Sequence, residues 1–262
     1  MAERKVRQLY FSPTGTTRAV VETIADTLGN TGETLDLLRQ PLKGEAEDEV
    51  LFAADDLLVA GMPVYAGRIP ALCRPMLSRL KGNGTPAVAV AVYGNRDYDD
   101  ALLELKNLLE ENGFVVIGAG AFVAQHSIFP SVGRSRPDGD DRSAAADFAR
   151  RCLGKLEDFD PRAHAFLEVK GNFPYKQPGS VPLKPSGNWR CNRCGACPIL
   201  CPAGAIAPET PRKTDKSRCI SCAACIAVCP TGARAFRGFL YRLAGRTFAK
   251  KCAARRESEV FV

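Results

Sequence analysis

Short apolar runs alternate with stretches of helical periodicity over the first 157 residues of this 262-residue chain. Ala87–Tyr93 is a continuous hydrophobic run, as expected of a strand that is buried on both faces. Asp99–Glu111 repeats leucine at positions that share one face of a helix. The alternation predicts an α/β fold with a doubly wound, five-stranded parallel sheet covered by helices. The predicted strands are Val6–Phe11, Thr34–Leu38, Leu57–Gly61, Ala87–Tyr93 and Phe114–Val123, and the predicted helices are Thr16–Leu28, Pro70–Leu80, Asp99–Glu111 and Ser143–Leu156.

The loop after the first predicted strand combines hydroxyl side chains, a glycine and the start of a helix. Doubly wound sheets bind ligands beyond the carboxyl ends of their strands, so this loop and the neighbouring loops are expected to contribute to a binding site. Free helix amides and the hydroxyls of Ser12–Thr17 suit a monophosphate, whereas the Gly-Lys-Ser/Thr of a Walker loop is absent. The alternative is a well-capped helix, with Ser12 or Thr14 as the cap.

Two further loops, Gly61–Arg68 and Tyr93–Tyr98, each offer an aromatic ring and backbone amides to a planar heterocycle. Together with Ser-Pro-Thr-Gly-Thr-Thr, they make this part of the chain resemble the flavodoxins. The resemblance implies bound FMN, with Tyr98 in the place of the aromatic ring that stacks on the flavin and Tyr65 beside its other face. The implied FMN residues are Ser12, Thr14, Gly15, Thr16, Thr17, Pro63, Val64, Tyr65, Ala66, Gly67, Tyr93, Gly94, Asn95, Arg96 and Tyr98.

The chain departs from the flavodoxin pattern in two of these loops. The second loop has no tryptophan, and the third loop, acidic in flavodoxins, is Asn95-Arg96-Asp97 here. An arginine beside a flavin would favour an anionic reduced ring, because the opposite charges attract.

Eight of the eleven cysteines form one pattern written twice, C-x2-C-x2-C-x3-C-P, with an offset of 28 residues. This spacing resembles the dicluster bacterial-type ferredoxins, in which the fourth cysteine of each run binds the other cluster. The resemblance implies two [4Fe-4S] clusters in a small α+β domain. One cluster takes Cys191, Cys194, Cys197 and Cys229, and the other takes Cys219, Cys222, Cys225 and Cys201.

Zinc and disulfides are weaker explanations of the same cysteines. Zinc ribbons use separated C-x2-C pairs, so the third cysteine and the trailing Cys-Pro have no role there. The chain begins without a recognisable signal peptide, which favours metal binding over disulfides and predicts a cytoplasmic protein. No apolar run is long enough to predict a transmembrane helix.

Charge is divided unevenly, with a net −3 over residues 1–187 and +10 over residues 188–262. Steered encounter with an acidic redox partner protein is the leading explanation. Simple compensation of the cluster charges is the alternative, while nucleic acid is less favoured because no recognition motif accompanies the cations. A homodimer is left open.

The pattern predicts four segments: a flavodoxin-like domain at 1–157, a Pro/Gly-rich linker at 158–187, a ferredoxin domain at 188–235 and a basic amphipathic tail at 236–262. The tail either packs the ferredoxin domain onto the rest, which is favoured, or docks on a partner or membrane surface. The three remaining cysteines sit at apolar helix positions and are expected to be buried. His126 follows the fifth strand and is expected to be structural, with a place at the edge of the ligand as the alternative.

The whole chain resembles a prokaryotic flavodoxin–ferredoxin family of electron-transfer proteins. This resemblance implies that electrons pass between the clusters and FMN, and so between redox partners. The alternatives are an FMN-dependent reductase of a small molecule, fed by its own clusters, and a redox sensor.

Overall fold

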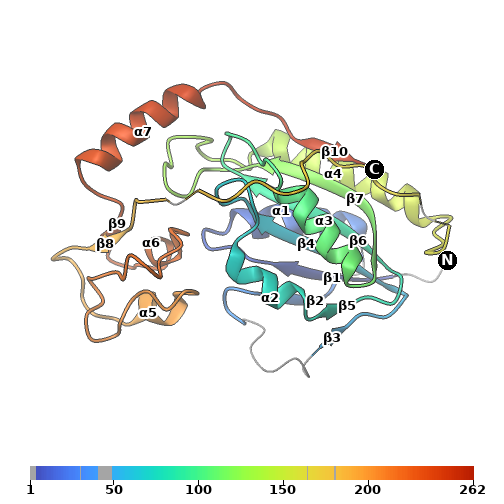
Figure 1. Cartoon of the computed structure of the whole chain (residues 1–262), viewed down its shortest axis with the longest axis horizontal. Helices are drawn as coiled ribbons and strands as arrows, with labels where there is room; N and C mark the ends of the chain where they lie inside the picture. The colour runs from blue at the N-terminus through green and yellow to red at the C-terminus, as the bar shows by residue number, and fades with distance from the viewer. Residues whose placement is uncertain (1–3, 30, 41–48, 164, 180) are drawn as a thin grey trace.

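A computed structural model describes residues 4–29, 31–40, 49–163, 165–179 and 181–262. A six-stranded sheet with its helices forms the larger part of the molecule, and the cysteine-rich region lies beside it (Figure 1). The strands of this sheet are β1 (Lys5–Tyr10), β2 (Thr31–Asp36), β4 (Asp56–Pro63), β6 (Thr85–Tyr93), β7 (Phe114–Val123) and β10 (Glu259–Phe261).

The strand order is β10-β7-β6-β4-β1-β2. The five strands from β2 to β7 pair in parallel and, counted along the chain, stand in the flavodoxin-like order 2-1-3-4-5. The predicted doubly wound fold is therefore confirmed. The sixth strand, β10, was not predicted; it pairs antiparallel with β7, with Val260 opposite Gly120.

Helices cover both faces of the sheet and bury its apolar side chains. On one face, Val21 and Phe148 belong to a core shared by two helices that pack together, and Leu77 and Leu105 belong to the core on the other face. These helices are α1 (Thr16–Leu28) and α4 (Gly139–Leu156) on the first face, and α2 (Arg74–Leu77) and α3 (Ala101–Glu111) on the second. Cys73 and Cys152 lie in these cores and, like Cys252, are buried as predicted.

The predicted helix at 70–80 is much shorter in the structure. A 3-10 turn, η1 (Ala71–Cys73), leads into α2, and the chain then forms β5 (Leu80–Lys81). This strand pairs in parallel with β3 (Val50–Leu51) in a separate two-stranded sheet. Pairing with a distant segment has replaced the last turn of the expected helix.

The cysteine-rich region is built from two short helices and a two-stranded ribbon. These elements are β8 (Ser186–Gly187), α5 (Ala196–Leu200), α6 (Ala224–Ala227) and β9 (Arg234–Ala235). Its backbone repeats the 28-residue offset of the sequence, because left-handed residues recur at equivalent positions. The pairs are Arg193 and Ser221, Gly195 and Ala223, and Gly204 and Gly232.

The segment that joins the two regions is tied to the start of α3. The Asp100 carboxylate accepts hydrogen bonds from the backbone amides of Asn172 and Lys176, at 2.8 and 2.7 Å. Burial alone would raise the pKa of Asp100, but these hydrogen bonds hold it below its usual value. Arg68 also donates to the Lys176 carbonyl, at 2.9 Å. The connection therefore lies along the surface of the sheet region with specific contacts.

After the ribbon the chain forms α7 (Phe239–Lys251) and returns along the sheet to β10 (Figure 1). Asn95, which follows β6, fixes this return. Its amide donates to the carbonyls of Cys252 and Ala254, at 2.8 and 2.9 Å, and its oxygen accepts from the Arg256 amide at 3.1 Å. Among the described residues, no helix is both long and apolar enough to cross a bilayer.

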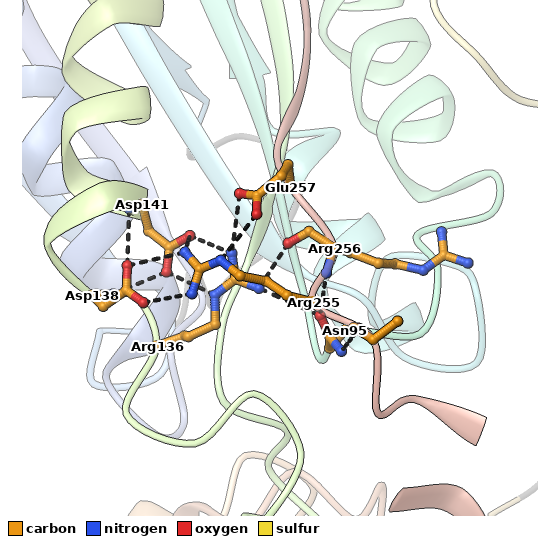
Figure 2. Close-up of polar contacts among 8 residues, drawn as sticks. Asn95, Arg136, Asp138, Asp141, Arg255, Arg256 and Glu257 are labelled. Carbon is orange, nitrogen blue, oxygen red and sulfur yellow. Dashed lines mark hydrogen bonds and ion pairs between the residues drawn. The ribbon is translucent and has the colours of Figure 1, made fainter. Parts of the chain in front are cut away.

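Ion pairs at the start of α4 hold the same return segment (Figure 2). The buried guanidinium of Arg136 pairs with Asp141 and donates to the Arg256 carbonyl at 2.8 Å. Arg255 pairs with Asp138, the N-cap of α4, at 2.7 Å. The C-terminal segment is thus bound to the sheet region at several points.

Candidate functional site

A cavity of ≈ 430 Å³ lies at the carboxyl ends of β1, β4 and β6. This is the edge at which doubly wound sheets bind ligands. All three loops predicted to contact a flavin contribute to it, through Thr14, Thr16, Thr17, Pro63, Val64, Tyr65, Ala66, Gly67, Tyr93, Gly94 and Arg96. Four other predicted flavin residues, Ser12, Gly15, Asn95 and Tyr98, do not line it.

The first loop presents the start of α1 to the cavity. Gly15 precedes the helix with a left-handed backbone, φ 86°, and no side chain caps the helix in the usual way. Ser12 lies behind the loop, where its hydroxyl accepts a hydrogen bond from the Arg18 amide at 3.0 Å. The amides of Thr16 and Thr17 have no partner within the described part of the chain, so they can receive an anion.

Tyr98 lies in the core, contrary to the expectation that its ring faces a flavin. It is 1% exposed, and its hydroxyl donates to the Glu259 carboxylate at 2.6 Å. Asn95 is turned in the same way toward the return segment. Both side chains are held there because β10 joins the edge of the sheet beside their loop. Tyr93, which packs 5.6 Å from Tyr98, is the tyrosine of this loop that reaches the cavity.

Apart from His126, whose place at the ligand edge was the alternative expectation, the wall opposite the three loops was not predicted. It comes from the segment after β7, from the linker and from α7, and includes His126, Phe129, Leu183 and Phe248. The rings of His126 and Phe129 both contact Phe248, with centroids 4.8 and 5.2 Å away. Apart from the position of His126 just after β7, no local signal identifies these residues, because they meet only in the folded chain.

His126 is held as a neutral imidazole of one tautomer. Its Nδ1 accepts hydrogen bonds from the backbone amides of Ile128 and Phe129, both at 3.1 Å, which leaves the ring proton on Nε2. Burial, with a smaller contribution from Arg96, lowers the pKa of His126 to about 4. His126 therefore brings a hydrogen-bond donor, and no positive charge, to the edge of the cavity.

The motif cysteines gather in two groups that exchange their fourth members. Burial, together with smaller contributions from the neighbouring thiols of Cys225, Cys201 and Cys219, raises the pKa of Cys222 to about 12. These four cysteines line one small cavity and are called the proximal set below.

Cys229 lies with the first motif. Burial raises the pKa of the Cys197 thiol, Arg234 lowers it, and the neighbouring thiols of Cys191 and Cys229 raise it. Cys191, Cys194, Cys197 and Cys229 are called the distal set below.

The proximal set adjoins the large cavity. Ile220 and Ser221, which stand between Cys219 and Cys222, line that cavity together with Tyr65. Lys184 lines it too, and its ammonium donates to the Cys219 carbonyl at 2.6 Å and to the Ser221 hydroxyl at 3.1 Å. One loop therefore connects a cysteine set with the predicted flavin pocket.

Residues 190–233 match the family model described as a 4Fe-4S dicluster domain. This chain joins a flavodoxin-like domain to a 4Fe-4S dicluster domain. No curated protein sequence shows significant similarity to it.

Solved structures similar to the flavodoxin-like domain have low sequence identity. A flavodoxin from the domain Archaea is 13% identical, with a TM-score of 0.41 over 58% of this chain and 99% of that one. A Streptococcus pneumonia flavodoxin is 16% identical, with a TM-score of 0.42 over 58% and 99%. The apo form of an NADH:FMN oxidoreductase is 17% identical, with a TM-score of 0.42 over 60% and 91%. The assignment of a flavodoxin-like fold therefore rests on the strand order of the sheet and not on these similarities.

The dicluster domain offers a donor set suited to cubanes. No group of three or more His, Cys, Asp or Glu side chains in the described part of the chain is close enough to hold one metal ion. A cubane makes a different demand, because each of its four irons takes one thiolate. Backbone amides also point at the sulfurs, with Ala205 donating to Cys201 at 3.2 Å and Ser221 to Cys219 at 3.4 Å.

Arg234, which the sequence did not single out, is a buried cation between the two cysteine sets. It is 2% exposed and donates to the Pro211 and Pro185 carbonyls at 2.6 and 3.1 Å. Its charge lowers the pKa of both Cys197 and Cys225, against the effect of burial. Its Nε is buried without a conventional partner among the described residues, so it is free to donate to a cluster sulfur. These features fit a pair of anionic clusters.

The distal set faces solvent. Cys194 is exposed, and Trp189 and Ile199 beside this set are 77% and 87% exposed. Arg190, Arg193 and Arg212 are exposed beside this set, and Arg212 donates to the Trp189 and Cys191 carbonyls at 3.4 and 3.5 Å. The accessible end of the dicluster domain is thus basic and partly apolar.

Proposed function

We propose that this chain relays electrons between two [4Fe-4S] clusters and a bound FMN, and so between redox partner proteins. The observation that carries the proposal is the position of Ile220 and Ser221. They belong to a cysteine motif of the dicluster domain, yet they line the same cavity as the phosphate-loop residues of the flavodoxin-like domain. This contact gives electrons a short path between the two domains.

In this proposal, the proximal set of cysteines binds the cluster next to the flavin, and the distal set binds the other cluster. Cys201 and Cys229 each cross to the cluster of the other motif. The thiol neighbours of Cys222 and Cys197 support this assignment. Bound clusters supply one-electron redox chemistry, while Arg234 offsets their negative charge from a buried position.

FMN would lie in the cavity with its phosphate at the start of α1. The unpartnered amides of Thr16 and Thr17 and the hydroxyl of Thr14 are the groups that hold a monophosphate there. Tyr65 and Tyr93 border the space for the ring system, and His126 supplies a donor at its edge. The linker and Phe248 help to exclude water from this space.

The redox partner is proposed to dock where the distal set is exposed. The cations around Trp189 favour an acidic protein surface, because complementary charge steers encounter. We take the flavodoxin-like domain as residues 1–157, the linker as 158–187, the ferredoxin domain as 188–235 and the tail as 236–262. The hydrogen bonds of Asp100 and Asn95 support a fixed arrangement of the two domains and argue against a swinging one.

Anaerobic purification followed by cofactor analysis tests the proposal. About eight irons and one FMN per chain are expected, from two four-iron clusters and one flavin pocket. Zinc in place of iron, or a chain that cannot retain flavin, would contradict it. Rapid turnover of a small acceptor by the isolated chain, without a partner protein, would instead favour the reductase.

A further inference from the structure

The outward face of α7 exposes large apolar side chains in one place. Phe239 and Leu240 are 72% and 73% exposed, and Leu243, one turn further on, is 52% exposed. Other exposed apolar residues lie far from this helix in sequence, such as Leu51 on β3 and Phe166 in the linker. A contiguous apolar patch on a surface helix marks a site of interaction.

This exposure is a fixed feature of the fold, because the opposite face of α7 is packed. The Tyr241 ring stacks on Phe129 with centroids 5.5 Å apart, and its hydroxyl donates to the Ile128 carbonyl at 2.9 Å. Phe248 packs against His126 at the cavity wall. The residues that follow are bound by Asn95. The tail thus packs against the flavodoxin-like domain with one face and leaves the other face open.

The charge on this helix has a single sign. The segment from Phe236 to Arg256 holds seven Lys and Arg residues and no acidic residue. Arg242, Arg246 and Lys250 are exposed beside the apolar patch. Long cationic side chains can reach past apolar neighbours to bind anions, while their methylene stems cover apolar surface. The occupant of this face must therefore be both anionic and apolar.

We propose that the outward face of α7 binds the surface of an anionic membrane. Phe239, Leu240 and Leu243 would enter the boundary between headgroups and acyl chains, while the cations bind lipid phosphates. An acidic protein is less favoured. Three side chains on a 13-residue helix are few against the roughly 800 Å² that each partner of a stable protein interface buries.

Vesicle flotation with the full-length, cofactor-loaded protein tests this inference. Binding is expected to vesicles that contain phosphatidylglycerol, and it should weaken as salt rises and be far weaker on phosphatidylcholine alone. The double variant Phe239→Ser/Leu243→Ser should lose at least about tenfold in vesicle affinity, because lipid affinity scales with the apolar area inserted. Arg242→Glu removes one cation and adds one anion, so it should reduce binding by at least about fivefold.

Matched controls separate the site from general effects of surface change. Leu51→Ser and Phe166→Ser make similar changes at exposed positions outside α7, and Lys155→Glu reverses an exposed charge on α4. All three should bind like the unaltered protein. Iron and FMN content should be the same in every variant, so failure here would leave the electron-relay proposal standing.

Two results would overturn the inference. One is absence of binding to anionic vesicles at low salt, and the other is equal binding by the Phe239→Ser/Leu243→Ser variant and its controls. Loss of binding to an acidic redox partner in the same double variant, with no vesicle binding by the unaltered protein, would assign this face to a protein.

Discussion

Lys184 should set the reduction potential of the proximal cluster. Its ammonium lies between the cavity and the Cys219 loop, 2.6 Å from the Cys219 carbonyl. Reduction adds negative charge to a cluster, so a nearby cation stabilises the reduced state. The substitution Lys184→Met removes the charge and keeps much of the length of the side chain. The proximal potential should therefore become more negative.

The size of the shift follows from Coulomb's law. If the two charges are taken to lie about 7 Å apart in an effective dielectric constant of about 20, the interaction would be about 2.4 kcal/mol. That energy corresponds to about 100 mV for a one-electron couple. Lys184 is only partly buried, and solvent screening should reduce the shift to about 50–100 mV. The distal cluster should move much less.

A potentiometric titration followed by EPR provides the measurement. Lys184→Arg keeps the charge and should leave both potentials close to their original values. Lys216→Met removes an exposed cation from the same domain and should also have little effect. A proximal shift below about 20 mV, a shift toward positive potential, or equal shifts of both clusters would refute the electrostatic argument.

Three further outcomes are expected. Burial holds the pKa of His126 near 4, whereas the imidazole of the unfolded chain protonates below about 6.5. The free energy of unfolding should therefore fall by up to about 3 kcal/mol as the pH drops from about 6.5 to about 4. Denaturation at several pH values should show this loss, and His126→Phe should remove it. Cys201→Ser should damage the cluster of the second motif and Cys229→Ser that of the first, as EPR of each variant would reveal; damage confined to the variant's own motif would exclude the exchange. Ala223 and Gly195 both have left-handed backbone, with φ 65° and 81°, which is unfavourable for a residue with a side chain. Ala223→Gly should therefore stabilise the dicluster domain, and Gly195→Ala, although it has open space around its α-carbon, should destabilise it. Each change should be about 1 kcal/mol in thermal unfolding.

The sheet could be predicted because its elements carry strong local signals. The bounds of α1 and β7 agree with those expected from the pattern, since an apolar stripe and a long apolar run define them without help from distant residues. The doubled cysteine motif likewise carries its spacing in the sequence. The family match over residues 190–233 agrees with it.

The features that the sequence did not indicate depend on contacts between distant segments. β10 is only three residues long, too short for a recognisable alternating pattern, and it forms a strand because the edge of β7 is available for pairing. That pairing brings Glu259 to Tyr98 and so removes Tyr98 from the cavity. Lys184 and Phe248 reach the cavity from the linker and from α7, and no local pattern could connect them with it.

The central claim, that clusters and flavin form one path, is tested most directly by anaerobic stopped-flow reduction of the loaded protein. Dithionite should reduce the clusters first, and flavin bleaching should follow within the same chain at a rate independent of protein concentration. Loss of the proximal cluster in Cys222→Ser should abolish that phase even when FMN remains bound. Flavin that stays oxidised beside reduced clusters, or a rate that rises with protein concentration, would contradict the account.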